Sequence, residues 1–220
     1  MAKFQLSRQI LPGFEAISKL TNGDIAELSE VCRNVFVGAS PSTFIKQVRA
    51  LSHIDGINRI ATTLFGLVGI LATDDSREEE LASDLADSYN DSRLEAELQE
   101  EDLRRLKANL LILFSSLANQ RLTFKAHTLL TDNENIYQNA KFLSDIRLVF
   151  DDDIQEIKRN AVVIHQLKLS YKIGDNDKDF FISLDSLDLI KLKSQIERAI
   201  EKERLIKHDY SDKITFIELE

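Results

Sequence analysis

The spacing of apolar positions changes partway along the chain. Over roughly the first 130 residues, apolar side chains recur every three or four positions, which is the spacing of one helix face. From Phe142 they alternate every second residue, as in a half-buried strand. The pattern predicts an α+β protein, with an all-helical bundle over residues 1–130 and a second domain over residues 131–220. We expect the second domain to contain a small antiparallel sheet and one long C-terminal helix.

Local signals divide the N-terminal part into helices. Thr21-Asn22-Gly23 ends a first helix, and Asp24 can cap the second. Ser40-Pro41 supplies a cap followed by a proline at the first helical position. The stretch 103–130 is apolar at helical spacing and is long enough for two helices, with Asn119-Gln120 as the expected break. Six short helices around a shared interior are predicted.

The segment Ile60–Ala72 is apolar on all sides. It is shorter than the roughly 20 residues that a membrane-spanning helix requires. We therefore expect a helix buried in the bundle, with no membrane insertion. The small residues that would permit close packing of this helix are Thr62, Thr63, Gly66 and Gly69.

An acidic stretch, Thr73–Asp102, interrupts the apolar pattern. Its carboxylates greatly outnumber its two arginines, Arg77 and Arg93. Such runs are usually solvated, so a linker or an exposed helix is expected. Docking of a basic partner is the alternative for this stretch.

Three stretches after residue 140 have the strand period. Ile146, Leu148 and Phe150 define the first strand, and Ala161–Ile173 forms a longer second strand. Phe180–Leu184 forms the third and should pair with the second as a hairpin. A fourth strand at 213–220, where KITFIELE alternates, is a further possibility.

A long helix is expected to follow the third strand. Asp185 can cap it, with Asp188 favourably placed in the first turn, and its apolar stripe can cover one face of the sheet. Three strands and one helix leave the other face and both edges open, so a partner should cover them. The expected dimer-interface residues are Ile146, Leu148, Val163, His165, Leu167, Leu169, Tyr171, Leu192 and Ile196.

The order FLSDIRLVF, AVVIHQLKLSYKI, a polar turn and DFFISLDSLDLIKLKSQIERAIEKE, over about residues 142–205, resembles the C-terminal domain of the COMM-domain proteins. That family has a helical N-terminal domain followed by three strands and a long helix. Two features depart from it. The chain has no tryptophan, so Ile146 or Arg147 stands where the family usually has one, and Lys213–Glu220 extends beyond the usual end of the family's helix.

The resemblance implies obligate dimerisation, with two such domains interlocking through sheets and helices, and a scaffolding role. Eukaryotic members of that family build a larger assembly linked to endosomal cargo recycling and to control of transcription-factor signalling. The expected partner is the chain itself or a homologous chain, within a larger protein assembly. The choice between homodimer and heterodimer stays open.

Amino-acid composition disfavours some classes of binding partner. A formal net charge of −9 disfavours binding to nucleic acid and to anionic lipid. Cys32 is the single cysteine, which excludes an internal disulfide and suits a reducing, cytoplasmic environment.

No motif predicts catalysis or a cofactor. Asp175, Asp177 and Asp179 resemble the start of a calcium loop, but Phe180 stands where glycine is required and Ser186 where a bidentate glutamate is required. The sequence Asp151-Asp152-Asp153 with Glu156 is better interpreted as turn residues than as a cation site. The histidines 53, 127, 165 and 208 are dispersed without a ligand-like pair, and Cys32 has no evident base.

Two functions are therefore compatible with the sequence. The favoured one is a non-enzymatic scaffold or adaptor subunit that dimerises through its C-terminal domain. The alternative is a regulatory or accessory subunit of a multi-protein enzyme or defence system, in which the acidic stretch docks a catalytic partner.

Overall fold

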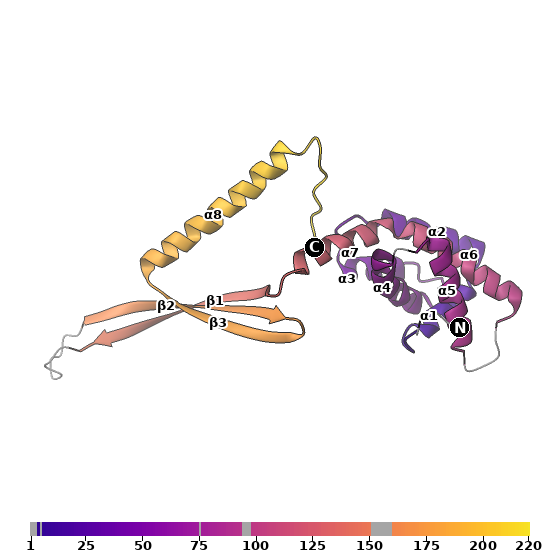
Figure 1. Cartoon of the computed structure of the whole chain (residues 1–220), viewed down its shortest axis with the longest axis horizontal. Coiled ribbons are helices and arrows are strands. Elements are labelled where there is room, and N and C mark those ends of the chain that lie inside the picture. The colour runs from indigo at the N-terminus through magenta and orange to yellow at the C-terminus, as the bar shows by residue number, and fades with distance from the viewer. Residues whose placement is uncertain (1–3, 5, 75, 94–97, 151–159) are drawn as a thin grey trace. The chain divides into compact units, whose positions relative to one another are not determined.

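The computed structural model describes residues 4, 6–74, 76–93, 98–150 and 160–220. In this part of the chain, helices come first, a three-stranded antiparallel sheet follows and a long helix comes last, which confirms the α+β class (Figure 1). The chain forms two compact units. Unit 1 comprises Met1–Leu129 together with Ile217–Glu220, and unit 2 comprises Leu130–Phe216.

Unit 1 is a bundle of helices around one apolar core. Its largest fully buried side chains include Phe14, Phe44 and Phe114, which come from three different helices. The bundle helices are α1 (Leu11–Ser18), α2 (Asn22–Asn34), α3 (Pro41–Arg49), α4 (Ile57–Thr73), α5 (Glu78–Asp91), α6 (Glu100–Ser116) and α7 (Ala118–Thr131).

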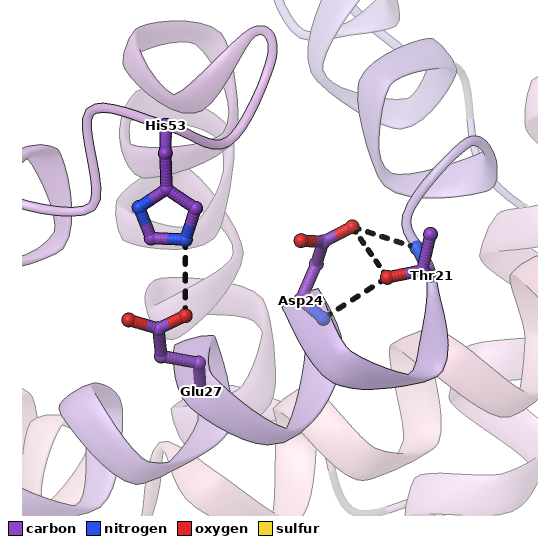
Figure 2. A network of polar contacts seen from close by, with 4 residues as sticks. All are labelled: Thr21, Asp24, Glu27 and His53. Carbon is purple, nitrogen blue, oxygen red and sulfur yellow. Dashed lines mark hydrogen bonds and ion pairs between the residues drawn. The ribbon is translucent and has the colours of Figure 1, made fainter.

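Side-chain caps set the starts of α2 and α3. The Thr21 hydroxyl accepts a hydrogen bond from the Asp24 amide at 3.2 Å, and the Asp24 carboxylate accepts one from the Thr21 amide at 2.9 Å (Figure 2). These two hydrogen bonds form a capping box, in which Thr21 is the N-cap. The expectation that Asp24 is the cap is wrong, because Asp24 lies three positions later, in the first turn of α2. At α3 the expected cap is confirmed, because the Ser40 hydroxyl accepts from the Thr43 amide at 3.2 Å and Pro41 opens the helix.

The acidic stretch contains a core helix, which the sequence pattern did not predict. Helix α5 buries Leu81, Leu85 and Tyr89, and the Tyr89 ring stacks on Phe14 with centroids 5.5 Å apart. The expectation of a solvated segment is wrong for α5, because apolar residues recur every three or four positions among the carboxylates. The first-turn glutamates 78, 79 and 80 favour the helix through its dipole. Residues 75 and 94–97 of the stretch lie outside the described residues.

The break between α6 and α7 lies at Leu117, before the expected Asn119-Gln120. Both amide side chains lie within α7 and bond to the end of α2. Asn119 Nδ2 donates to the carbonyl oxygens of Arg33 and Val35 at 3.1 and 2.9 Å, and Gln120 Nε2 donates to that of Cys32 at 3.1 Å. The two amides therefore satisfy α2 carbonyls that have no partner within their own helix.

Helices α1 and α4 approach each other closely at Gly13. A Cβ atom at this position would collide with the Thr63 hydroxyl, and the Thr63 hydroxyl donates to the Ile10 carbonyl oxygen at 3.3 Å. The expected close packing through Gly66 is wrong, because Gly66 is exposed and has open space around it.

Gly13→Ala is expected to lower the free energy of unfolding by about 1–3 kcal/mol, because the added methyl overpacks the contact with Thr63. Higher helix propensity, worth about 1 kcal/mol, offsets part of this loss. Gly66→Ala is the matched control and should gain about 0.5–1 kcal/mol. Urea unfolding followed by circular dichroism measures both, and stabilisation by both variants would contradict the close approach.

Unit 2 contains strands β1 (Ile136–Val149), β2 (Asn160–Ile173) and β3 (Asn176–Leu184), in the order β1-β2-β3 with antiparallel pairing throughout. The predicted hairpin of the second and third strands is confirmed, with Gly174 (φ +56°) in its turn. Strand β1 begins before the expected Phe142, because the polar residues there pair through their backbone without an apolar alternation.

Helix α8 (Ser186–Asp209) follows β3 after one residue. Its predicted cap is confirmed, because the Asp185 carboxylate accepts from the Asp188 amide at 2.8 Å. The expected fourth strand is wrong for the described chain: residues 214–220 form no strand. Residues Ile217–Glu220 belong to unit 1, where the Glu220 amide donates to the Gly38 carbonyl oxygen at 3.0 Å.

Candidate interaction surface

One face of the unit 2 sheet gathers apolar side chains from all three strands. Directly opposed residues of antiparallel strands share a face. Leu167 of β2 lies between Phe142 of β1 and Ile182 of β3, and Val163 lies opposite Ile146. We call this the apolar face. Its members are Tyr137, Ala140, Phe142, Ser144, Ile146, Leu148, Ala161, Val163, His165, Leu167, Leu169, Tyr171, Lys178, Phe180, Ile182 and Leu184, with Lys178 as the one charged side chain, at the end of the face.

The apolar face is largely open to solvent in the single chain. Ile146 is 73% exposed, Phe180 54% and Val163 51%, whereas Leu167 at the centre is 6% exposed. Soluble monomers rarely expose a contiguous apolar surface of this kind. The face therefore has the character of an interface.

The opposite face of the sheet is mixed: exposed apolar side chains such as Val162 and Phe181 lie on it beside a polar cluster. Lys168 and Asp179 form an ion pair at 2.9 Å, and the Ser170 hydroxyl donates to Asp179 at 2.7 Å. The hydrogen bonds from Lys168 and Ser170 hold the pKa of Asp179 below its ordinary value. The Lys168 ammonium also lies 5.9 Å from the ring centroid of Phe181. This arrangement distinguishes the two faces chemically.

A polar pair lies within the apolar face. The Ser144 hydroxyl and His165 Nδ1 are 2.8 Å apart and come from directly opposed positions on β1 and β2. Each group has a hydrogen-bond partner within the sheet. Covering the face would thus leave neither of these two atoms without a partner, which is the requirement for burying polar groups at low cost.

The sheet brings together seven of the nine residues expected from the sequence at the dimer interface: Ile146, Leu148, Val163, His165, Leu167, Leu169 and Tyr171. The other two, Leu192 and Ile196, lie on α8, which has no buried residue. The expectation that this helix covers a sheet face is therefore wrong. Asp185 alone separates β3 from α8, so the helix begins directly at the end of the strand.

Three residues of the apolar face were not among those expected from the sequence: Phe142, Phe180 and Ile182. All three lie beside the β2 residues Leu167 and Leu169. The signal that identifies them is the strand register, which a two-residue turn at Gly174-Asp175 fixes for β2 and β3.

Two other chemistry-bearing side chains lie in unit 1. Burial raises the pKa of the Cys32 thiol to about 12, so it is protonated at neutral pH. His53 Nε2 lies 3.0 Å from the Glu27 carboxylate on the surface of unit 1, near the Thr21–Asp24 capping box (Figure 2).

In the part of the chain that the structure describes, no group of three or more His, Cys, Asp or Glu side chains is placed to hold an ion. Asp175 lies in the β2–β3 turn, and Asp177 and Asp179 lie on β3. The acidic sequence Asp151-Asp152-Asp153 with Glu156 lies outside the described residues.

Among the helices of the described ranges, none is both long and apolar enough to cross a membrane. The chain matches no protein-family model and no curated protein.

Proposed function

We propose that the chain is a non-enzymatic interaction subunit that dimerises by covering the apolar face of unit 2. The observation that supports this proposal is the distribution of buried side chains. Among the described residues of unit 2, Leu167 is the only buried hydrophobic side chain, whereas unit 1 contains a full core.

The energetics argue against unit 2 standing alone. Ordering the backbone costs about 1–2 kcal/mol per residue. Fully burying one large apolar side chain returns only about 1.5–3 kcal/mol. A sheet with one such side chain needs additional buried surface, and its apolar face is the part that can supply it.

A second copy fits this face well. Two sheets can pack face to face with their side chains interdigitated, about 10 Å apart. A two-fold axis brings the same patch of each subunit together, so an apolar patch is complementary to itself. The Ser144 hydroxyl and His165 Nδ1 already bond to each other, which lowers the cost of burying these two atoms.

The resemblance to the COMM-domain proteins points in the same direction, because dimerisation through a small sheet is what that family implies. On this proposal the dimer takes part in a larger protein assembly, in the cytoplasm, without a cofactor. A net charge of −9 agrees with protein partners better than with nucleic acid.

The alternative of an accessory subunit that docks an enzyme through its acidic stretch has less support. Glu78 of α5 pairs with Arg121 at 2.7 Å, and Asp87 pairs with Lys107 at 2.8 Å. These carboxylates are engaged within unit 1, so they are less available to a basic partner.

Sedimentation equilibrium of the full chain tests the proposal. We expect a reversible monomer–dimer equilibrium, with dimer the main species at micromolar concentration. Purification from the native source, with identification of co-eluting chains, then distinguishes a homodimer from a heterodimer. A chain that is monomeric, folded throughout and free of co-eluting proteins would overturn the proposal.

A further inference from the structure

In unit 1, the loop before α3 binds the side-chain carboxylate of Glu220. Glu220 Oε2 accepts a hydrogen bond from the Ser40 amide at 2.9 Å and another from the Thr43 hydroxyl at 2.7 Å. Ser40 is the N-cap of α3 and Thr43 lies in its first turn, where the helix dipole favours a negative charge. The bonds from Thr43 and Ser40 keep the pKa of Glu220 below its ordinary value.

The backbone of the same segment is held as well as its side chain. The Glu220 amide donates to the Gly38 carbonyl oxygen at 3.0 Å. Gly38 has φ +100°, and a Cβ atom there would collide with the Glu218 carbonyl oxygen. A residue other than glycine is therefore excluded both by the backbone conformation and by the approach of residues 217–220.

Helix α7 fixes the shape of this loop. The Thr123 hydroxyl accepts from the Gly38 amide at 2.8 Å, and Asn119 Nδ2 donates to the Val35 carbonyl oxygen at 2.9 Å. The hydrogen bonds between the loop and α7 thus stabilise it without the participation of residues 217–220. A preformed loop of this kind can bind a peptide without the cost of being ordered first.

The segment that occupies the site has the pattern of a short extended ligand. Ile217 and Leu219 are half-buried, whereas Glu218 and Glu220 are exposed. The Ile217 side chain approaches Gly38. The segment therefore contacts the loop in three ways: through the Ile217 side chain, the Glu220 amide and the Glu220 carboxylate.

We propose that Gly38, Ser40 and Thr43 form a binding site for an extended peptide anchored by a glutamate side chain. Residues 217–220 are its ligand within the same chain, and the same segment supplied by another molecule can replace them. This site lies wholly in unit 1 and does not depend on the dimerisation proposed for unit 2.

A labelled peptide of residues 213–220 tests the site by fluorescence anisotropy. In the full chain the internal segment competes with the peptide. In full-length Glu220→Ala this competitor has lost its anchor, so the peptide should bind about tenfold more tightly than to the unaltered chain. A peptide with glutamine at the position of Glu220 should bind several-fold more weakly, since it loses the charge.

Two further variants provide controls. Thr43→Val, added to Glu220→Ala, removes the hydroxyl donor while keeping the side-chain shape, and should weaken peptide binding again. Asp212→Asn removes a carboxylate after α8 without altering the contacts to Ser40 and Thr43, and should behave like the unaltered chain. Thermal melts of each variant verify that unit 1 stays folded.

Hydrogen exchange of the Ser40 amide gives an independent measurement. The amide should exchange faster in Glu220→Ala than in the unaltered chain or in Asp212→Asn, because its acceptor is gone. Equal peptide binding by the unaltered chain and Glu220→Ala, or equal Ser40 exchange in the two, would overturn the proposal.

Discussion

Val163→Asp is expected to dissociate the proposed dimer, raising its dissociation constant by about a hundredfold or more. Val163 lies on the apolar face, opposite Ile146. A charge covered by a second apolar face has no partner, and an unpaired buried charge costs several kcal/mol. About 2.8 kcal/mol corresponds to a hundredfold change, so even a partial penalty suffices.

The neighbouring residue provides a matched control. Val162 is 48% exposed and Val163 51%, but consecutive strand residues point to opposite faces, and Val162 lies opposite Arg147. Val162→Asp should therefore leave the dimer intact. Sedimentation velocity at several concentrations measures both variants. A dimeric Val163→Asp protein, or equal dissociation of both variants, would remove the apolar face from the interface.

Leu167→Ala is expected to lower the stability of unit 2 by about 2–5 kcal/mol, the usual loss for truncating a buried leucine. Leu167 is the buried centre of the sheet, whereas Leu169, on the same face, is half-buried. If folding of unit 2 is coupled to association, the melting temperature of this variant should rise with protein concentration, because mass action favours the dimer.

Leu110→Ala in α6 is the control for this second prediction. Leu110 is fully buried in the core of unit 1, so a similar loss is expected there. That core is complete within one chain, and the melting temperature of unit 1 should not depend on concentration. Calorimetry over a wide concentration range compares the two variants. A Leu167→Ala melt that is independent of concentration would separate the folding of unit 2 from association.

Local signals in the sequence predicted much of the fold. Alternation predicted three strands, and the caps at Ser40 and Asp185 lie where expected, because both depend on a few neighbouring residues. The burial of helix α5 was not predicted, because the high negative charge of the stretch indicated a solvated segment. The apolar stripe of Leu81, Leu85 and Tyr89 indicates a buried helix face. Burial of one helix face depends on that stripe and not on the charge of the other face.

The residues of β2 on the apolar face could be predicted because their alternation is visible in one strand. Their neighbours Phe142 and Phe180 required the register, which joins residues far apart in the sequence. The place of residues 217–220 could not be predicted at all. Glu220 bonds to Ser40 and Thr43 across 180 and 177 positions, and nothing local to either end indicates the other.

This long-range contact has a consequence for the order of events during synthesis. Helices α1 to α7 leave the ribosome first, then the strands of unit 2, and only afterwards residues 217–220. During synthesis, the loop at Gly38 therefore lacks its contacts with residues 217–220 until after the strands of unit 2 have left the ribosome. Since domains generally fold as units during translation, the bundle can assemble early but receives its last four residues only after all of unit 2 has been made.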